Sequence, residues 1–159
     1  MKETKSRKGE KSRINKSFIF FALIFFIYII DRQTKMLSSF LEGCFILCIK
    51  KSVNYGAAFG LMREFSFTRI LLIVIALVVL IFTAYLYFKN KNVNTLNIGL
   101  ALLFAGTLSN LFDRIIYGYV TDFIKIGFWQ GFPAFNIADL SNLIGVLIII
   151  TVLIKNKSS

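Results

Sequence analysis

Two aspartates in the second half of this 159-residue chain have the type and setting needed for chemistry. Asp122 stands in VTDFI and Asp139 in FNIADLSN, and each adjoins residues apolar enough to lie in a membrane. A charged side chain at membrane depth costs about 2.5–3.5 kcal/mol on insertion scales, so it persists where it is paired or functional. Neither aspartate has a cation next to it in the sequence, although Lys125 is three residues from Asp122.

A close pair of carboxyl groups in a low-dielectric site would have a defined chemistry. Both groups cannot ionise readily, so one keeps its proton and the pair presents an acid and a base together. Such a pair can activate water against an amide and protonate the leaving nitrogen, with no metal and no covalent intermediate. From the residues alone an aspartic dyad, two unrelated carboxylates and an ion or proton path all remain open.

Two further alternatives use the same residues. A divalent-metal site could be built from Asp113, Asp122 and Asp139, because hard cations prefer oxygen ligands. The chain could also be a scaffold without chemistry. The sequence has no histidine, which excludes histidine-based metal sites and Ser-His or Cys-His catalysis. No cofactor is expected.

The elements that position these aspartates are predicted to be membrane helices. Hydrophobic residues make up 57% of the chain. About 20 apolar residues at about 1.5 Å rise per residue cross the hydrocarbon layer. Four segments fit: roughly 17–30 with a polar continuation to about 37, then 70–88, 96–112 and 137–154. The predicted fold class is a mainly α membrane protein with four transmembrane helices.

The basic residues predict the orientation of these helices. The net charge is +11, and residues 1–16 carry Lys and Arg throughout. We expect this stretch to be a disordered basic cytoplasmic tail that contacts anionic lipids rather than nucleic acid. No small-x-small cleavage site follows the first span, so it is expected to stay as an anchor. Four spans then return the basic tail 155–159 to the cytoplasm, together with the basic loop 89–95.

Two connections are predicted on the outer side. Residues 38–68 contain ILCIKKSV and then NYGAAFG, which predicts one or two strands, a turn and a return. Gly56 in that turn allows a tight bend or a close approach to a ligand. Cys44 and Cys48 would be too far apart on one strand to form a disulfide, whereas on a helix they could come near each other. Both are expected to be small buried apolar residues. Residues 113–136 form the second connection, which is rich in aromatic residues.

This topology gathers polar residues at one face of the membrane. Four of the eight acidic residues reach it with three asparagines; they are Asp31, Asp113, Asp122, Asp139, Asn54, Asn110 and Asn136. Asp113 is expected to pair with its neighbour Arg114, since an opposite charge favours the ionised carboxylate. Arg114 lies one helical turn from Asn110, so both are expected to face one polar pocket. Asp31 is expected to have a positioning role at the outer end of the first span.

Five stretches, in order, resemble the lipoprotein signal peptidases, also called type II signal peptidases. They are DRQTK at 31–35, NYGAAFG at 54–60, AGTLSNLFDR at 105–114, GYVTDFI at 118–124 and FPAFNIAD at 132–139. The resemblance covers about residues 17–154. It implies a single four-helix membrane domain over that range, with a small β-sheet cradle on the extracytoplasmic face that corresponds to about residues 38–68.

The resemblance also implies an activity, that of a membrane aspartic endopeptidase. Family members remove the signal peptide from a diacylglyceryl-modified prolipoprotein, cutting just before the lipidated cysteine. The dyad would be Asp122 and Asp139, and no metal is involved. Residues implied to line or support the site are Asn54, Gly56, Asn110, Arg114, Asn136, Asp31 and Asp113.

The implied setting is the cell (inner or cytoplasmic) membrane, with both termini cytoplasmic and the site near the extracytoplasmic face. The implied partners are the lipid-modified prolipoprotein and membrane lipids, with no nucleic acid, and a monomer is expected. The chain departs from the family pattern at Ser109, where glycine is usual, and at Arg32, where glutamine is common. Ser109 is expected to crowd helix packing slightly, and neither change touches the implied dyad.

Overall fold

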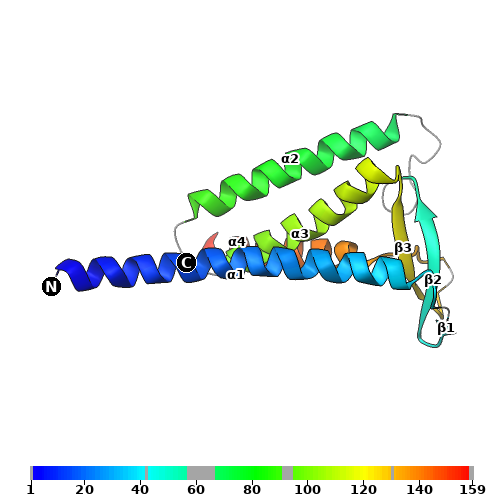
Figure 1. Cartoon of the computed structure of the whole chain (residues 1–159), viewed down its shortest axis with the longest axis horizontal. Coiled ribbons are helices and arrows are strands. Elements are labelled where there is room, and N and C mark those ends of the chain that lie inside the picture. Colours follow the sequence, from blue (N-terminus) through cyan, green and yellow to red (C-terminus); the bar gives the residue numbers. More distant parts are fainter. Residues whose placement is uncertain (1, 42, 57–66, 91–94, 130, 158–159) are drawn as a thin grey trace.

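Four helices and a three-stranded sheet make up the described chain (Figure 1). The structure is a computed structural model that describes residues 2–41, 43–56, 67–90, 95–129 and 131–157, with side chains described from residue 17 onwards. The helices are α1 (Lys2–Leu37), α2 (Thr68–Lys89), α3 (Thr95–Ile116) and α4 (Ile137–Lys157), and the strands are β1 (Gly43–Cys44), β2 (Leu47–Asn54) and β3 (Val120–Ile126). The return predicted after the start of NYGAAFG, and most of the predicted loop 89–95, lie outside the described residues.

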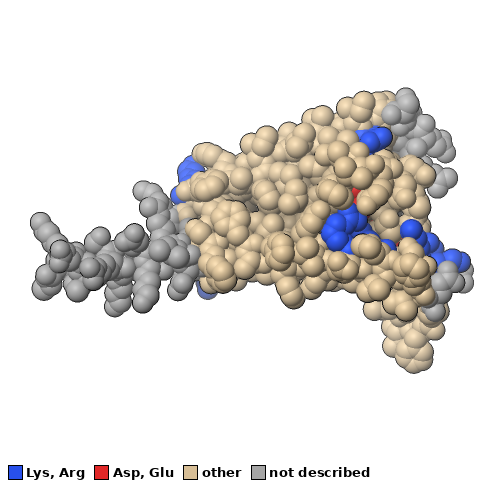
Figure 2. All heavy atoms as spheres, viewed as in Figure 1, with Lys and Arg blue, Asp and Glu red and all other residues tan. Residues whose placement is uncertain are grey.

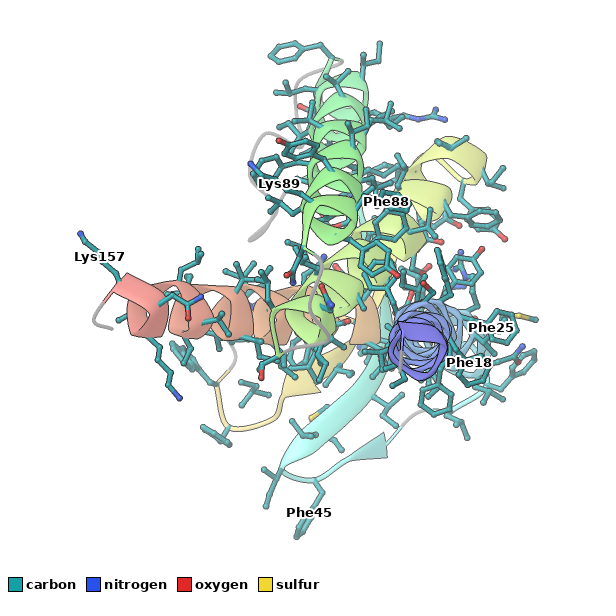
Figure 3. The ribbon with its side chains drawn as sticks, turned by 90° about the vertical axis from the view of Figure 1, so that its left-hand side faces the viewer. Phe18, Phe25, Phe45, Phe88, Lys89 and Lys157 are labelled. Atoms are coloured by element: carbon teal, nitrogen blue, oxygen red, sulfur yellow. A yellow bond between two sulfur atoms is a disulfide. The ribbon has the colours of Figure 1, made fainter. Side chains whose placement is uncertain are left out.

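Each helix contains a stretch long and apolar enough to cross a membrane, so the four predicted spans are confirmed. These stretches are Ser17–Leu37, Thr68–Lys89, Thr95–Ile116 and Ile137–Lys157. Large apolar side chains such as Phe25 and Phe88 are exposed on the helices, as suits lipid contact (Figure 3). The expectation of a disordered tail over residues 1–16 is wrong, because α1 begins at Lys2. That stretch has no proline and is rich in Lys, Arg and Glu, which are good helix formers.

Helix α3 is the centre of the bundle. Helices α1, α2 and α4 all pack against it, and α2 leans away from α4 (Figures 1 and 3). Small residues allow α3 and α4 to approach closely. A Cβ atom at Gly106 would meet the carbonyl oxygen of Ala138 and would lie 2.5 Å from Oδ1 of Asn142. The small residues of AGTLS at 105–109 therefore allow the close contact of α3 with α4.

The larger apolar core cluster lies in the half of the bundle away from the sheet, and a smaller cluster joins Ala76 and Leu80 of α2 to Leu111 of α3. Phe20 of α1 stacks on Tyr87 of α2 with ring centroids 3.8 Å apart. Leu100 and Ala101 of α3 complete the larger cluster and are fully buried. The residues of α3 that follow toward the sheet are increasingly polar, so the bundle leaves its polar side chains at one end.

The sheet caps that end of the bundle (Figure 1). It is antiparallel with the order β1-β2-β3, and β2 and β3 align Ser52 with Asp122 and Asn54 with Val120. The sheet thus joins the two predicted outer connections. Strand β3 was not predicted from the sequence, although the β-branched residues of VTDFIKI are typical of a strand.

The hairpin of β1 and β2 overturns the prediction for the two cysteines. Cys44 is paired with Cys48 across the hairpin, and a disulfide joins them. The chain reverses between the two residues, so the spacing along one strand does not apply. Cys44 is exposed rather than buried, and Phe45 at the hairpin tip is 88% exposed and projects away from the bundle (Figure 3).

Candidate active site

Asp122 and Asp139 reach the same site from two elements. Asp122 lies on β3, and Asp139 lies in the first turn of α4. Asn136 joins them: its Nδ2 donates to Oδ1 of Asp122 at 2.7 Å, and its backbone N–H donates to Oδ2 of Asp139 at 3.2 Å. Its Oδ1 accepts from the backbone N–H of Asp139 at 2.8 Å, the usual contact of a residue that caps a helix N-terminus. One asparagine therefore fixes both carboxylates and the start of α4.

Two more asparagines donate to the carboxylate oxygens that Asn136 leaves free, one on each aspartate. Nδ2 of Asn54 donates to Oδ2 of Asp122 at 3.0 Å, which follows from the pairing of β2 with β3. Nδ2 of Asn110 donates to Oδ1 of Asp139 at 2.7 Å, across the contact of α3 with α4. The structure therefore brings the three asparagines to these two carboxylates, as the sequence predicted.

The electrostatics of the site favour protonation of Asp122 at a higher pH than is usual for an aspartate. The pKa of Asp122 is raised to about 6, mainly because burial removes water from the carboxylate and further because Asp139 lies nearby. Hydrogen bonds from Asn54 and Asn136, and the ammonium group of Lys35, act in the opposite direction. Near neutral pH this carboxyl group is therefore able both to hold and to release a proton.

Both aspartates line one cavity of about 360 Å³. Its polar end also carries Asn54, Asn110 and Arg114, so the predicted common pocket of Asn110 and Arg114 is confirmed. Arg114 donates through Nη2 to the carbonyl oxygen of Gly56 at 3.2 Å, and the N–H of Gly56 donates to Oδ1 of Asn54 at 2.9 Å. The apolar walls come from residues such as Val120, Ile126, Phe132, Phe135, Leu140 and Leu143.

Asp113 lies outside this cavity, and its expected pairing with Arg114 is wrong. Adjacent residues of a helix do not face each other. Asp113 instead pairs with two cations of α1, Arg32 at 2.5 Å and Lys35 at 2.8 Å. Arg32 thus supplies a charge that compensates a buried carboxylate.

Asp31 ties α1 to the other two helices of the site. Its Oδ1 accepts from the backbone N–H of Ala138 at 2.9 Å, at the start of α4. Its Oδ2 accepts from Ser109 Oγ at 2.6 Å and pairs with Lys35, also at 2.6 Å. Ser109 is fully buried and makes a contact with Asp31 that a glycine could not make, so it does more than crowd the helices.

Lys35 is the functional candidate that the sequence reasoning missed. Its Nζ donates to Oδ1 of Asn110 at 3.0 Å, while Nδ2 of Asn110 donates to Asp139. Its four-residue spacing from Asp31 in DRQTK was the available signal, because residues so spaced meet on a helix face. Among the side chains that the structure describes, Asp31, Asp113 and Asp122 are buried, and little red is visible in Figure 2, where Lys and Arg gather near the sheet.

The metal-site alternative finds no support in the geometry. Among the residues that the structure describes, no three carboxylate or thiol groups lie close enough to share an ion. Asp113, which that alternative required, is held by Arg32 and Lys35.

Fold and site together define an integral membrane enzyme. The chain superposes with a TM-score of 0.79 on a bacterial membrane enzyme solved by the in meso method at 2.3 Å resolution, with 33% identity over 88% of this chain and 90% of that one. A bacterial membrane enzyme solved in the same way at 1.9 Å gives a TM-score of 0.76, with 34% identity over 86% and 93% of the two chains. The family model for signal peptidase (SPase) II matches residues 23–155. The chain belongs to this family.

Curated relatives agree with that assignment. The lipoprotein signal peptidase of Staphylococcus aureus (strain JH9) is 39% identical over 134 residues, which are 83% of this chain and 80% of that protein. The lipoprotein signal peptidase of Wigglesworthia glossinidia brevipalpis is 44% identical over 99 residues, 61% of this chain. That match spans 64% of the Wigglesworthia protein, somewhat less than two thirds of its length.

Proposed function

We propose that this chain is an aspartic endopeptidase that removes the signal peptide from diacylglyceryl-modified prolipoproteins. Membership of the signal peptidase II family supports the reaction. One observation carries the assignment of the dyad: Asn136 is hydrogen-bonded to both Asp122 and Asp139, and both aspartates line one cavity. The bond cut would be the amide just before the lipidated cysteine.

The chemistry follows from the properties of a carboxyl pair. One aspartate is ionised and removes a proton from water, which attacks the scissile carbonyl carbon. The other aspartate is protonated and donates a hydrogen bond to the carbonyl oxygen. Collapse of the tetrahedral intermediate breaks the C–N bond, and a proton passes to the leaving nitrogen. The two groups titrate as a unit, so base and acid are not assigned to individual residues.

The remaining site residues have supporting roles in this proposal. Asn54, Asn110 and Asn136 orient the carboxylates, and Arg114 and Gly56 hold the outer wall of the cavity. Asp31 anchors α1 to α3 and to the start of α4, which carries Asp139, and Asp113 anchors α3 to α1. The apolar walls suit a signal peptide and its attached lipid.

We place residues 17–154 in the cell membrane as a single domain, a monomer with both termini cytoplasmic and the sheet on the extracytoplasmic side. The sheet lies at the opposite end of the bundle from the last turns of α2 and α4, which carry Lys89 and Lys157 (Figure 1). The cavity is lined by Asp122 and Val120 of the sheet, so these basic residues lie at the far end from it, which supports this orientation. A substrate held by the membrane would then reach the dyad from the lipid layer, because the walls next to the dyad are apolar.

Cleavage of a diacylglyceryl-modified prolipoprotein by the purified protein tests the proposal. Asp122→Asn and Asp139→Asn should each lower kcat by about 10²–10⁴, the usual contribution of a general acid or base. Thr151→Ala, which removes an exposed hydroxyl of α4 far along the helix, should leave the rate unchanged. EDTA should have no effect. Full activity in Asp139→Asn would contradict the proposed catalytic dyad. Loss of activity in EDTA would favour a metal-dependent enzyme.

A further inference from the structure

The cavity extends beyond the dyad along α4 to Asn142. Asn142 lies three residues after Asp139, about 4.5 Å further from the sheet along the helix axis. On the facing helix, Thr107 lies three residues before Asn110, in the same direction from the sheet. A second polar pair between α3 and α4 therefore lies one turn below the pair formed by Asn110 and Asp139.

The contacts of Asn142 fix the orientation of its amide. Oγ1 of Thr107 donates to Oδ1 of Asn142 at 3.3 Å. The same oxygen lies over Gly106, where a Cβ atom would be only 2.5 Å away. The carbonyl side of the amide thus faces α3. Among the described residues, Nδ2 of Asn142 has no hydrogen-bond acceptor, and the side chain is half-buried in the cavity wall.

An unfilled amide donor is unfavourable at this position. Asn142 lies within the membrane-crossing stretch of α4, where lipid chains offer no acceptor. If Asn142 served only to join the two helices, its Oδ1 would be accounted for, because it accepts from Thr107. The two N–H groups of its Nδ2 would still have no role. Ser141 shows the alternative, because it is buried and donates to the carbonyl oxygen of Leu102 without lining the cavity.

We propose that Asn142 forms a carbonyl-binding subsite for the bound lipopeptide. Its Nδ2 donates to an uncharged carbonyl oxygen, either a main-chain carbonyl of the signal peptide or an ester carbonyl of the diacylglyceryl group. The acceptor is uncharged because a carboxylate or phosphate would lie one helical turn from Asp139 and near Asp122. The subsite rests on the proposed function, since it assigns part of the substrate to the same cavity.

Affinity and kinetics of Asn142→Leu test the subsite. The ligand is a diacylglyceryl lipopeptide whose scissile amide is replaced by a ketomethylene group, so that binding is measured without cleavage. Its Kd, and the KM of the cleavable substrate, should rise about three- to tenfold, as expected for one lost neutral hydrogen bond. The kcat should stay within about twofold. Ser141→Ala, the matched control, should change neither Kd nor KM.

A second substrate separates the two carbonyl sources. An ether-linked dialkylglyceryl lipopeptide lacks the ester carbonyls. If an ester is the acceptor, the parent protein binds this ligand more weakly and Asn142→Leu weakens binding no further. If the main chain is the acceptor, Asn142→Leu weakens binding of ether and ester ligands equally.

Thr107→Val provides a second variant in case Asn142→Leu does not fold. It leaves Asn142 in place but frees its Oδ1, so the amide can turn and binding should weaken by a smaller factor. An unchanged Kd for both ligands in both folded variants overturns the subsite, as does a parent protein that does not bind the lipopeptide. Binding that depends on Asn142 in a parent protein that fails to cleave would overturn the proposed function alone.

Discussion

At the scale of single residues, asparagine amides rather than cations hold the two carboxylates. An amide supplies donors and an acceptor at once, whereas an ammonium group supplies donors only. Oδ1 of Asn110 accepts from Lys35 and from Nδ2 of Asn136, so its Nδ2 is left to face Asp139. Lys35 lies on α1, whereas Asn110 lies on α3 and Asp139 on α4. Its contact with Asn110 therefore determines that Asp139 faces the nitrogen of the Asn110 amide rather than the oxygen.

Asn54→Ala should move the pH dependence of cleavage. Nδ2 of Asn54 stabilises the ionised form of Asp122, so its removal should raise the pKa of Asp122 above its value of about 6. The limb of the kcat/KM profile near that pH should shift upward by as much as about one pH unit, given about 1.5 kcal/mol for a hydrogen bond to a charged group. Activity is then lost at pH 6–7 if Asp122 must be ionised, and extends to higher pH if it must be protonated.

Ser52→Ala is the control for this shift. Ser52 is aligned with Asp122 in the sheet, but no hydrogen bond joins their side chains among the described contacts. Its profile should match that of the parent. A limb that stays in place or moves to lower pH in Asn54→Ala would contradict the role given to Asn54.

At the scale of elements, the contact of α3 with α4 positions the dyad, and Gly106→Ala should disturb it. The added Cβ would meet the backbone of Ala138 and the side chain of Asn142, so α4 must shift where it carries Asp139. Overpacking of this kind usually costs about 1–3 kcal/mol of stability. We expect a lower unfolding temperature in detergent and a cleavage rate reduced at least tenfold.

Gly43→Ala is the matched control, because a Cβ there has no neighbour within 4 Å. It should unfold at the temperature of the parent and cleave at its rate. Wild-type activity and stability in Gly106→Ala would show that α4 tolerates displacement, contrary to the role given to this contact.

The helices were predictable from sequence because each is a long apolar segment, and the limits of α2 and α4 follow from where apolar residues end. Strand β3 was missed because VTDFIKI is short and its partner β2 lies far away in the chain. The partner of Asp113 was misassigned for a related reason: sequence proximity suggested Arg114, whereas helix packing brings Arg32 and Lys35. Both strand β3 and the ion pairs of Asp113 depend on contacts between segments that are far apart in the sequence. The roles of Asp122 and Asp139 stay a prediction.

At the scale of the whole molecule, the orientation in the membrane is testable by labelling. In a protein with Cys44 and Cys48 replaced by serine, single cysteines at Lys89 and Lys157 should react with an impermeant thiol reagent only after the cells are opened. A single cysteine at Lys125, on β3, should react in intact cells. Labelling of Lys89→Cys in intact cells would reverse the proposed orientation.

The surroundings of the dyad determine where its protons come from. The described hydrogen bonds to Asp122 and Asp139 come from amide and backbone N–H groups of Asn54, Asn110 and Asn136. An amide does not pass a proton onward, so Asn110 provides no proton path between Asp139 and Lys35, although it is hydrogen-bonded to both. Protons exchanged during turnover must then travel through water in the cavity, and a bound substrate that displaces this water would trap the dyad in the protonation state it had at binding.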